Sequence, residues 1–172
     1  MAINFPEGTQ SLPSNVLKVY SAHFTGVQSI TNSTRANITN LSITLTPQSS
    51  SSKFLCFGNV TMGEGTTSGA LYLMRGSTDI FKNTTNAGSV IEGTIAYHSS
   101  GDTGYVYGTN TQGFGYLDSP GTTSSITYKI QGHRFYGGNY LTINGSRADV
   151  QNGDTNNYMG RSVSSLVIFE VL

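Results

Sequence analysis

NITNLSITLT, residues 37–46, decides the fold class of this chain. Its alternate residues Leu41, Ile43 and Leu45 are apolar, and the residues between them are hydroxylated or amide side chains. This period of two is typical of a β-strand with one face against a core and the other toward solvent. The next apolar segment, KFLCFGNVTM at residues 53–62, begins apolar on both faces. That pattern predicts a central strand covered on both sides, or a strand at a subunit contact.

Short strand-like segments and turn residues alternate along the rest of the chain, and no segment reads as a convincing amphipathic helix. About ten short strands with turns between them predict an all-β fold, an antiparallel two-sheet β-sandwich of jelly-roll type. The length fits a single domain, expected over residues 16–172, and residues 1–15 are expected to form an extended N-terminal arm because they carry two prolines and no periodicity. The further candidate strands are 16–20, 70–75, 78–81, 89–97, 104–107, 114–117, 124–131, 139–143 and 164–171.

Charged residues are few and balanced, nine Lys and Arg against nine Asp and Glu, and they form no basic run. Nucleic acid is therefore not an expected partner. No apolar run reaches the length of a membrane span, so no membrane insertion is expected, and the N-terminus lacks the pattern of a secretion signal, which predicts synthesis in the cytoplasm. A neutral surface of Ser, Thr, Asn and Gly carries little self-repulsion, which favours assembly with further copies.

Catalytic and metal-binding patterns are weak. The chain has no G-x-S-x-G segment, and its three histidines, His23, His98 and His133, are too far apart to suggest a zinc site. Cys56, the one cysteine, sits in an apolar run and is expected to be a buried thiol. We therefore predict no catalytic residue, no metal and no cofactor. Glycoside hydrolysis by a pair of the scattered carboxylates stays open at this point, because their separation is a property of the fold.

The segment YLDSPGTTSSITYKIQ, residues 116–131, combines a turn with a strand. Asp118 is expected to bond the backbone amides of the turn, and Gly121 to adopt a positive φ. After the turn, Ile126, Tyr128 and Ile130 share one face of the strand, with polar residues on the other. The segment therefore has a structural explanation, with one side toward a core.

Tyrosines beside glycines occur in GYVYG, GFGYLD and RFYGGNY, starting at residues 104, 113 and 134. Tyrosine in Gly- and Asn-rich loops is typical of adaptable contact surfaces, although tyrosine also suits strands and their ends. The loop residues that we predict to contact a ligand are Tyr105, Tyr107, Phe114, Tyr116 and Tyr136.

Five segments in this order resemble a family of small jelly-roll proteins, similar in outline to the C1q and TNF heads, that are virion structural proteins of tailed bacteriophages, especially marine and cyanobacterial phages. The shared features are a strand ending in Thr-Pro with a Ser-rich loop and a Lys-led strand, an L-x-R-G segment, an L-D-x-P segment running into T-Y-K, and a final strand of the form apolar-Glu-apolar. The corresponding segments here are MAINFP at the start, residues 37–60, 71–80, 116–131 and 160–172. The segment 101–115 has no counterpart in that pattern.

The resemblance implies a non-enzymatic homotrimer on the virion surface, attached to capsid or tail proteins. No fibrous shaft is evident in the sequence, so we expect a head decoration protein. The alternatives are a tail-fibre tip or receptor-binding adhesin that recognises host surface glycan, and a polysaccharide depolymerase. Ile3, Phe5 and Pro6 in the arm are the predicted anchor to the particle.

Overall fold

The computed structural model describes residues 15–31, 34–63, 67–84, 92–99, 107–136, 140–146, 148 and 160–172. The described residues form eleven β-strands, and every pairing between them is antiparallel. The strands are β1 (Val16–Phe24), β2 (Gln28–Ile30), β3 (Ala36–Leu45), β4 (Lys53–Gly63), β5 (Thr67–Arg75), β6 (Thr78–Phe81), β7 (Ile95–Ser99), β8 (Thr109–Asp118), β9 (Ile126–Tyr136), β10 (Leu141–Ile143) and β11 (Ser164–Val171).

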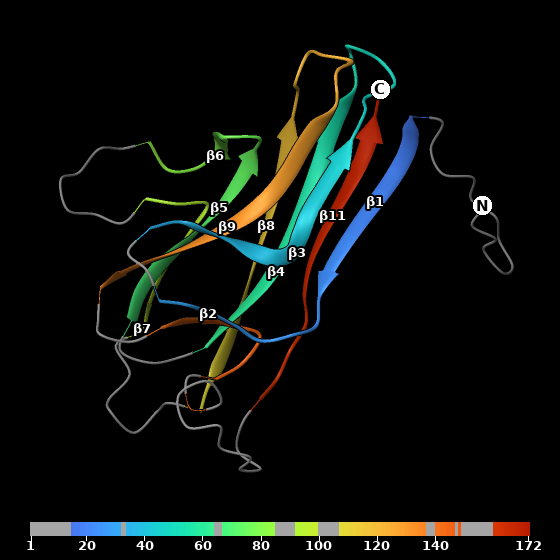
Figure 1. Cartoon of the computed structure of the whole chain (residues 1–172). Coiled ribbons are helices and arrows are strands. Elements are labelled where there is room, and N and C mark those ends of the chain that lie inside the picture. Colours follow the sequence, from blue (N-terminus) through green and yellow to red (C-terminus); the bar gives the residue numbers. More distant parts are fainter. Residues whose placement is uncertain are drawn as a thin grey trace, which may run out of the picture.

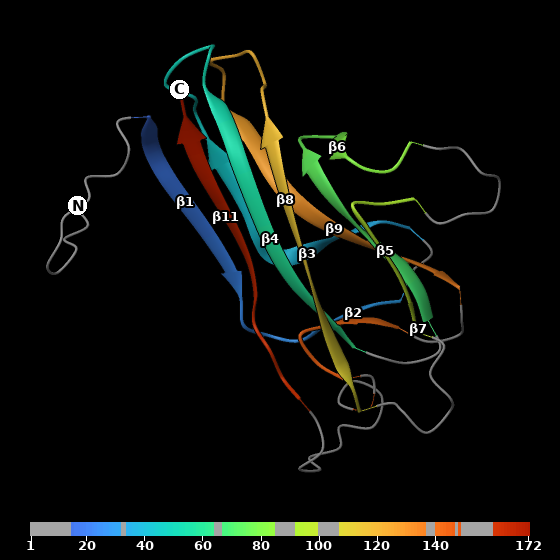
Figure 2. The ribbon, with the colours of Figure 1, turned by 180° about the vertical axis from the view of Figure 1, so that it is seen from behind.

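Two sheets pack face to face (Figures 1 and 2). The six-stranded sheet has the order β1-β11-β4-β10-β2, with β8 paired to the other side of β4, and the five-stranded sheet has the order β3-β9-β5-β6, with β7 also paired to β5. Taken without the short strands, the order β1-β11-β4-β8 faces the order β3-β9-β5-β7, which is the double Greek-key connectivity of a jelly roll. The all-β sandwich expected from the sequence is confirmed.

The core follows from the period of two in the strands. Leu41, Ile43 and Leu45 are buried, as the alternation in β3 predicts, and β11 buries every second residue along its whole length. Tyr128 and Phe54 are the largest side chains that are fully buried, with ring centroids 5.7 Å apart. These rings come from opposite sheets, so the two sheets meet through an aromatic contact.

Several strands differ in extent from the sequence expectation. β8 begins at Thr109 and not at Phe114, and β9 runs on to Tyr136, because pairing with a long neighbour holds polar and glycine residues extended. β2 was not expected, since three residues are too few to show a period. His98 lies inside β7, where its Nδ1 is 2.6 Å from the hydroxyl of Ser68.

Candidate functional site

The outward side of the six-stranded sheet carries an apolar surface. Residues directly opposite one another on antiparallel strands point to the same side of a sheet, so the register aligns Val19, Phe169, Leu55 and Leu117 in one row across β1, β11, β4 and β8. The next row aligns Ser21, Val167, Phe57 and Gly115. We call the apolar members of these rows the apolar face; they are Val19, Leu55, Phe57, Leu117, Val167 and Phe169.

This apolar face is continuous and exposed. The four strands that carry it lie side by side in Figure 2. Val19 is 42% exposed, Phe57 43% and Leu117 49%, and the other three side chains are half-buried. Phe57 packs edge-on against Phe169 with ring centroids 6.1 Å apart. The sequence signal for this surface was the start of the segment 53–62, apolar on both faces.

On β8, two glycines leave the outward side of the sheet without side chains next to Phe57 and Asn59. A Cβ atom on Gly115 would lie 3.2 Å from the ring of Phe57, and a Cβ on Gly113 would lie 2.6 Å from the side-chain oxygen of Asn59. No charged side chain occurs in the two aligned rows, and the nearest one in the register is Lys53, opposite Val171 at one end. The result is a smooth and uncharged surface in the middle of the sheet.

The predicted ligand-contacting residues do not form one exposed loop. Phe114 and Tyr116 lie in β8 opposite Gly58 and Cys56, so their rings point inward and pack against the core. Tyr116 stacks on Phe81 of β6, with ring centroids 4.8 Å apart, and this pair closes one edge of the sandwich. The two rings therefore serve the contact between the sheets, because the alternation of β8 turns them inward.

The other predicted site residues are only partly described. Tyr107 precedes β8 and is 38% exposed. Tyr136 is the last residue of β9, and its side chain lies outside the described residues. Also outside them are Tyr105 of the predicted loop and the predicted anchor residues Ile3, Phe5 and Pro6.

The side chain of Asp118 links the two sheets of the sandwich. We expected it to bond the amides of its own turn, but its carboxylate accepts two hydrogen bonds from Nη1 of Arg75, at 2.8 and 2.7 Å, and one from the hydroxyl of Tyr128 at 2.6 Å. The expectation was wrong because Asp118 ends β8 with its side chain inward, opposite Phe54. The positive φ of Gly121, at 65°, was predicted correctly. Burial, with the hydrogen bond to Asp118, raises the pKa of the Tyr128 phenol.

A second buried carboxylate, Glu170, lies on the other side of Phe54. It accepts hydrogen bonds from the backbone N–H of Gln48 at 2.6 Å and from the hydroxyl of Ser52 at 2.8 Å. The hydroxyl of Tyr20 lies 3.4 Å from its other oxygen. Burial raises the pKa of the Tyr20 phenol, and the negative charge of the nearby Glu170 raises this pKa further. Glu170 thus holds the Ser-rich loop against the end of the sandwich.

Polar residues of the motifs quoted above meet in these two networks. Arg75 comes from the L-x-R-G segment, Asp118 from L-D-x-P, Tyr128 from T-Y-K and Glu170 from the final strand. Each is bound to another part of the fold. These motif residues therefore have a structural role that is sufficient to account for their presence.

Cys56 lies fully buried on the inward side of β4, as expected from its apolar run. Burial, together with the neighbouring negative charge of Asp118, raises the pKa of the Cys56 thiol to about 12. A thiol with this pKa stays protonated near neutral pH and is a poor nucleophile.

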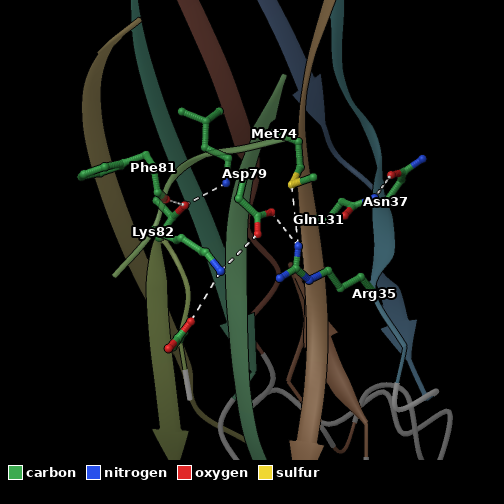
Figure 3. Close-up of polar contacts among 10 residues, drawn as sticks. Arg35, Asn37, Met74, Asp79, Phe81, Lys82 and Gln131 are labelled. Atoms are coloured by element: carbon green, nitrogen blue, oxygen red, sulfur yellow. Dashed lines mark hydrogen bonds and ion pairs between the residues drawn. The ribbon is translucent and has the colours of Figure 1, made fainter. Parts of the chain in front are cut away.

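The outward side of the five-stranded sheet carries an ion-pair network instead (Figure 3). Arg35, just before β3, places Nη1 2.6 Å from Oδ1 of Asp79. Lys82 lies 3.7 Å from the other oxygen of Asp79 and 3.5 Å from Glu92. The side-chain carboxyl groups of the described residues, those of Asp79, Glu92, Asp118 and Glu170, therefore all bind other side chains or backbone.

Comparisons with models of known protein families find no match to this chain, and no curated protein sequence matches it. In the part of the chain that the structure describes, no group of three or more His, Cys, Asp and Glu is placed to hold a metal ion. The same residues contain no helix long and apolar enough to cross a membrane.

Proposed function

We propose that this protein is a non-enzymatic surface protein of a bacteriophage particle, a homotrimer that assembles through the apolar face. The observation that carries this proposal is the exposed, uncharged surface around Phe57, Phe169 and Leu117. Contiguous exposed apolar surface in a monomer usually marks a contact with another molecule. The resemblance to phage jelly-roll proteins supports the virion setting and the trimer.

The energetics favour association through this face. A phenylalanine buries roughly 200 Å² when fully enclosed, so the 43% of Phe57 that is exposed corresponds to about 90 Å², or about 2 kcal/mol per copy at 25 cal/mol per Å². Val19 and Leu117 add apolar area on either side of the same surface. No charged group in the two rows has to lose water when a neighbour docks. A contact centred on Phe57 therefore gains apolar burial at little polar cost.

The described carboxylates also support a structural role over hydrolysis. A glycosidase needs two carboxyl groups that face one sugar, at a separation set by the mechanism. Asp118 and Glu170 face the interior and hold strands together, and Asp79 forms ion pairs with two cationic side chains. A depolymerase is the weaker proposal on these contacts.

Phe57→Lys tests the assembly. The substitution places an ammonium group in the centre of the apolar face, and burying it unpaired costs at least about 3 kcal/mol. That cost weakens association at least about 100-fold. In sedimentation velocity we expect the natural chain to sediment as a species of three times the 18.3 kDa chain mass and Phe57→Lys as a folded monomer.

Phe135→Lys is the matched control. Phe135 is a similarly exposed phenylalanine, at 40%, on the outward side of the five-stranded sheet, so this variant should remain associated. A natural chain that is monomeric at tens of micromolar, or a Phe57→Lys variant that still associates, would contradict the proposed role of the apolar face.

Placement on the particle is a separate test. We propose decoration of the head, because a homotrimer of compact jelly rolls suits attachment at the repeated positions of a capsid. Quantitative mass spectrometry of purified particles should then find copies in the hundreds, in a fixed ratio to the major capsid protein. A few to a few tens of copies would place the protein on the tail and favour the receptor-binding alternative.

A further inference from the structure

The side chain of Arg35 is held in one orientation and is partly exposed. The guanidinium carbon lies 3.6 Å from the centroid of the Tyr72 ring, and Nη1 donates to Asp79 and lies 4.0 Å from the sulfur of Met74. Figure 3 shows this side chain reaching across β9 toward Met74 and Asp79. Tyr72 is also an electrostatic partner of this guanidinium, and the side chain of Arg35 is 33% exposed. A partly exposed guanidinium that is held in one orientation is suited to a planar anion such as a carboxylate.

A second cation lies beside Arg35. Lys129 on β9 is opposite Met74, the residue whose sulfur lies against Nη1 of Arg35. Alternation along β9 puts Lys129 on the same side of the sheet as Gln131, whose amide donates to the side-chain oxygen of Asn37 at 2.8 Å. Lys129 makes no ion pair or hydrogen bond with the described part of the chain. The surface thus joins two cations to an amide pair that can bond hydroxyl groups.

Aromatic rings continue the same side of the sheet. His133 and Phe135 follow Gln131 at alternate positions of β9, and their ring centroids are 4.0 Å apart. Tyr72 lies on the other side of His133, with ring centroids 6.5 Å apart. Phe135 is 40% exposed, so one ring of this series presents apolar surface to solvent. An exposed aromatic ring of this kind can stack against the apolar face of a sugar ring.

We propose that the outward side of the five-stranded sheet binds an acidic saccharide, a chain of sugars that carry carboxylate groups. Arg35 and Lys129 bind the carboxylate, the amides of Asn37 and Gln131 bond hydroxyl groups, and the ring of Phe135 stacks against a sugar. This site does not depend on the assembly proposed above, because it lies on the opposite side of the sandwich from the apolar face.

A nucleic acid fits the same cations less well. Affinity for a phosphate backbone comes from many Lys and Arg contacts in series, and here Asp79 and Glu92 lie among the cations. A ligand with separated carboxylates and apolar sugar faces uses both halves of the surface.

The test is titration calorimetry of the full chain with oligogalacturonate, with maltodextrin as the neutral probe. We expect binding to oligogalacturonate and none to maltodextrin at the same concentration. Arg35→Gln should weaken binding about tenfold or more, since it removes a charge-assisted pair, and Lys129→Gln and Phe135→Ala should each weaken it about threefold to tenfold.

Lys53→Gln is the matched control, because it removes one positive charge from an exposed position on the other sheet. It should change the affinity less than twofold. Arg35→Gln also removes the Asp79 ion pair, so circular dichroism must show that this variant is folded. If it is not folded, the variants at the half-buried Lys129 and the exposed Phe135 keep the test decisive.

Three results would overturn the proposal. One is the absence of heat with oligogalacturonate. Another is an equal loss of affinity in Lys53→Gln and Lys129→Gln, which would mean nonspecific charge attraction. The third is binding of a DNA oligonucleotide with the same affinity and the same dependence on Arg35, which would show an unspecific anion site.

Discussion

Asp118→Asn is expected to remove a large part of the stability of the fold. Asp118 is 5% exposed, and its carboxylate accepts three hydrogen bonds of 2.6–2.8 Å from Arg75 and Tyr128. The amide keeps the shape of the side chain, but it is neutral and has one acceptor oxygen for these donors. Breaking a buried ion pair by removing one partner costs about 3–5 kcal/mol, and the partial exposure of Arg75, at 29%, favours the lower end, about 3 kcal/mol.

Urea unfolding followed by circular dichroism measures this loss. At one fixed protein concentration, with a urea m-value of about 2 kcal/mol/M, the midpoint should fall by about 1.5 M. Tyr128→Phe removes only the hydroxyl donor and should cost about 1.5–3 kcal/mol. Because the two residues share one hydrogen bond, the double variant should lose less stability than the sum of the single variants. A midpoint for Asp118→Asn within about 0.3 M urea of the natural chain would refute the structural role of this network.

Two further predictions concern the core. The thiol of Cys56 should not react with a disulfide reagent at pH 8 in the folded protein and should react fully in denaturant, so rapid labelling of the folded protein would contradict its burial. Because the pKa of this thiol rises from 9.0 to about 12 on folding, its contribution to stability is retained below pH 9 and declines as the pH rises toward 12. Gly58→Ala should lower the free energy of unfolding by about 1–3 kcal/mol, since the new Cβ would lie 2.3 Å from the ring of Phe114. Gly160→Ala, whose new Cβ would lie 3.5 Å from the hydroxyl oxygen of Thr109, should change it by less than about 0.5 kcal/mol. Equal effects of the two substitutions would show that Phe114 does not fill the space beside Gly58.

The sequence was sufficient for those parts of the fold that depend on local alternation. β11 begins and ends at the predicted residues, and Leu41, Ile43 and Leu45 of β3 face the core as predicted. Ile38 of β3 is also buried and was not predicted, because the register shifts between Asn37 and Ser42. The period of two reports which side of a strand is apolar, and that property needs no knowledge of neighbouring strands. The turn at Gly121 was equally local.

The candidate surfaces depend on the register between strands, so only part of each surface could be predicted from the sequence. The apolar character of the outer side of β4 was visible at residues 53–57, but its alignment with Val19 and Leu117 depends on which strands are neighbours. Asp118 was assigned to its own turn because its true partner, Arg75, is 43 residues away. Arg35 crosses a strand to reach Asp79, a contact that no spacing rule indicates.

Side-chain footprinting with hydroxyl radicals tests the central claim, that the apolar face is the assembly surface, most directly. The rate of oxidation of each phenylalanine reports how far its ring is exposed, and it can be followed from dilute to concentrated protein. We predict that Phe57 and Phe169 become protected as the concentration rises, while Phe135 on the opposite sheet stays reactive. If Phe57 remains as reactive as Phe135 at every concentration, the apolar face is not where the copies meet.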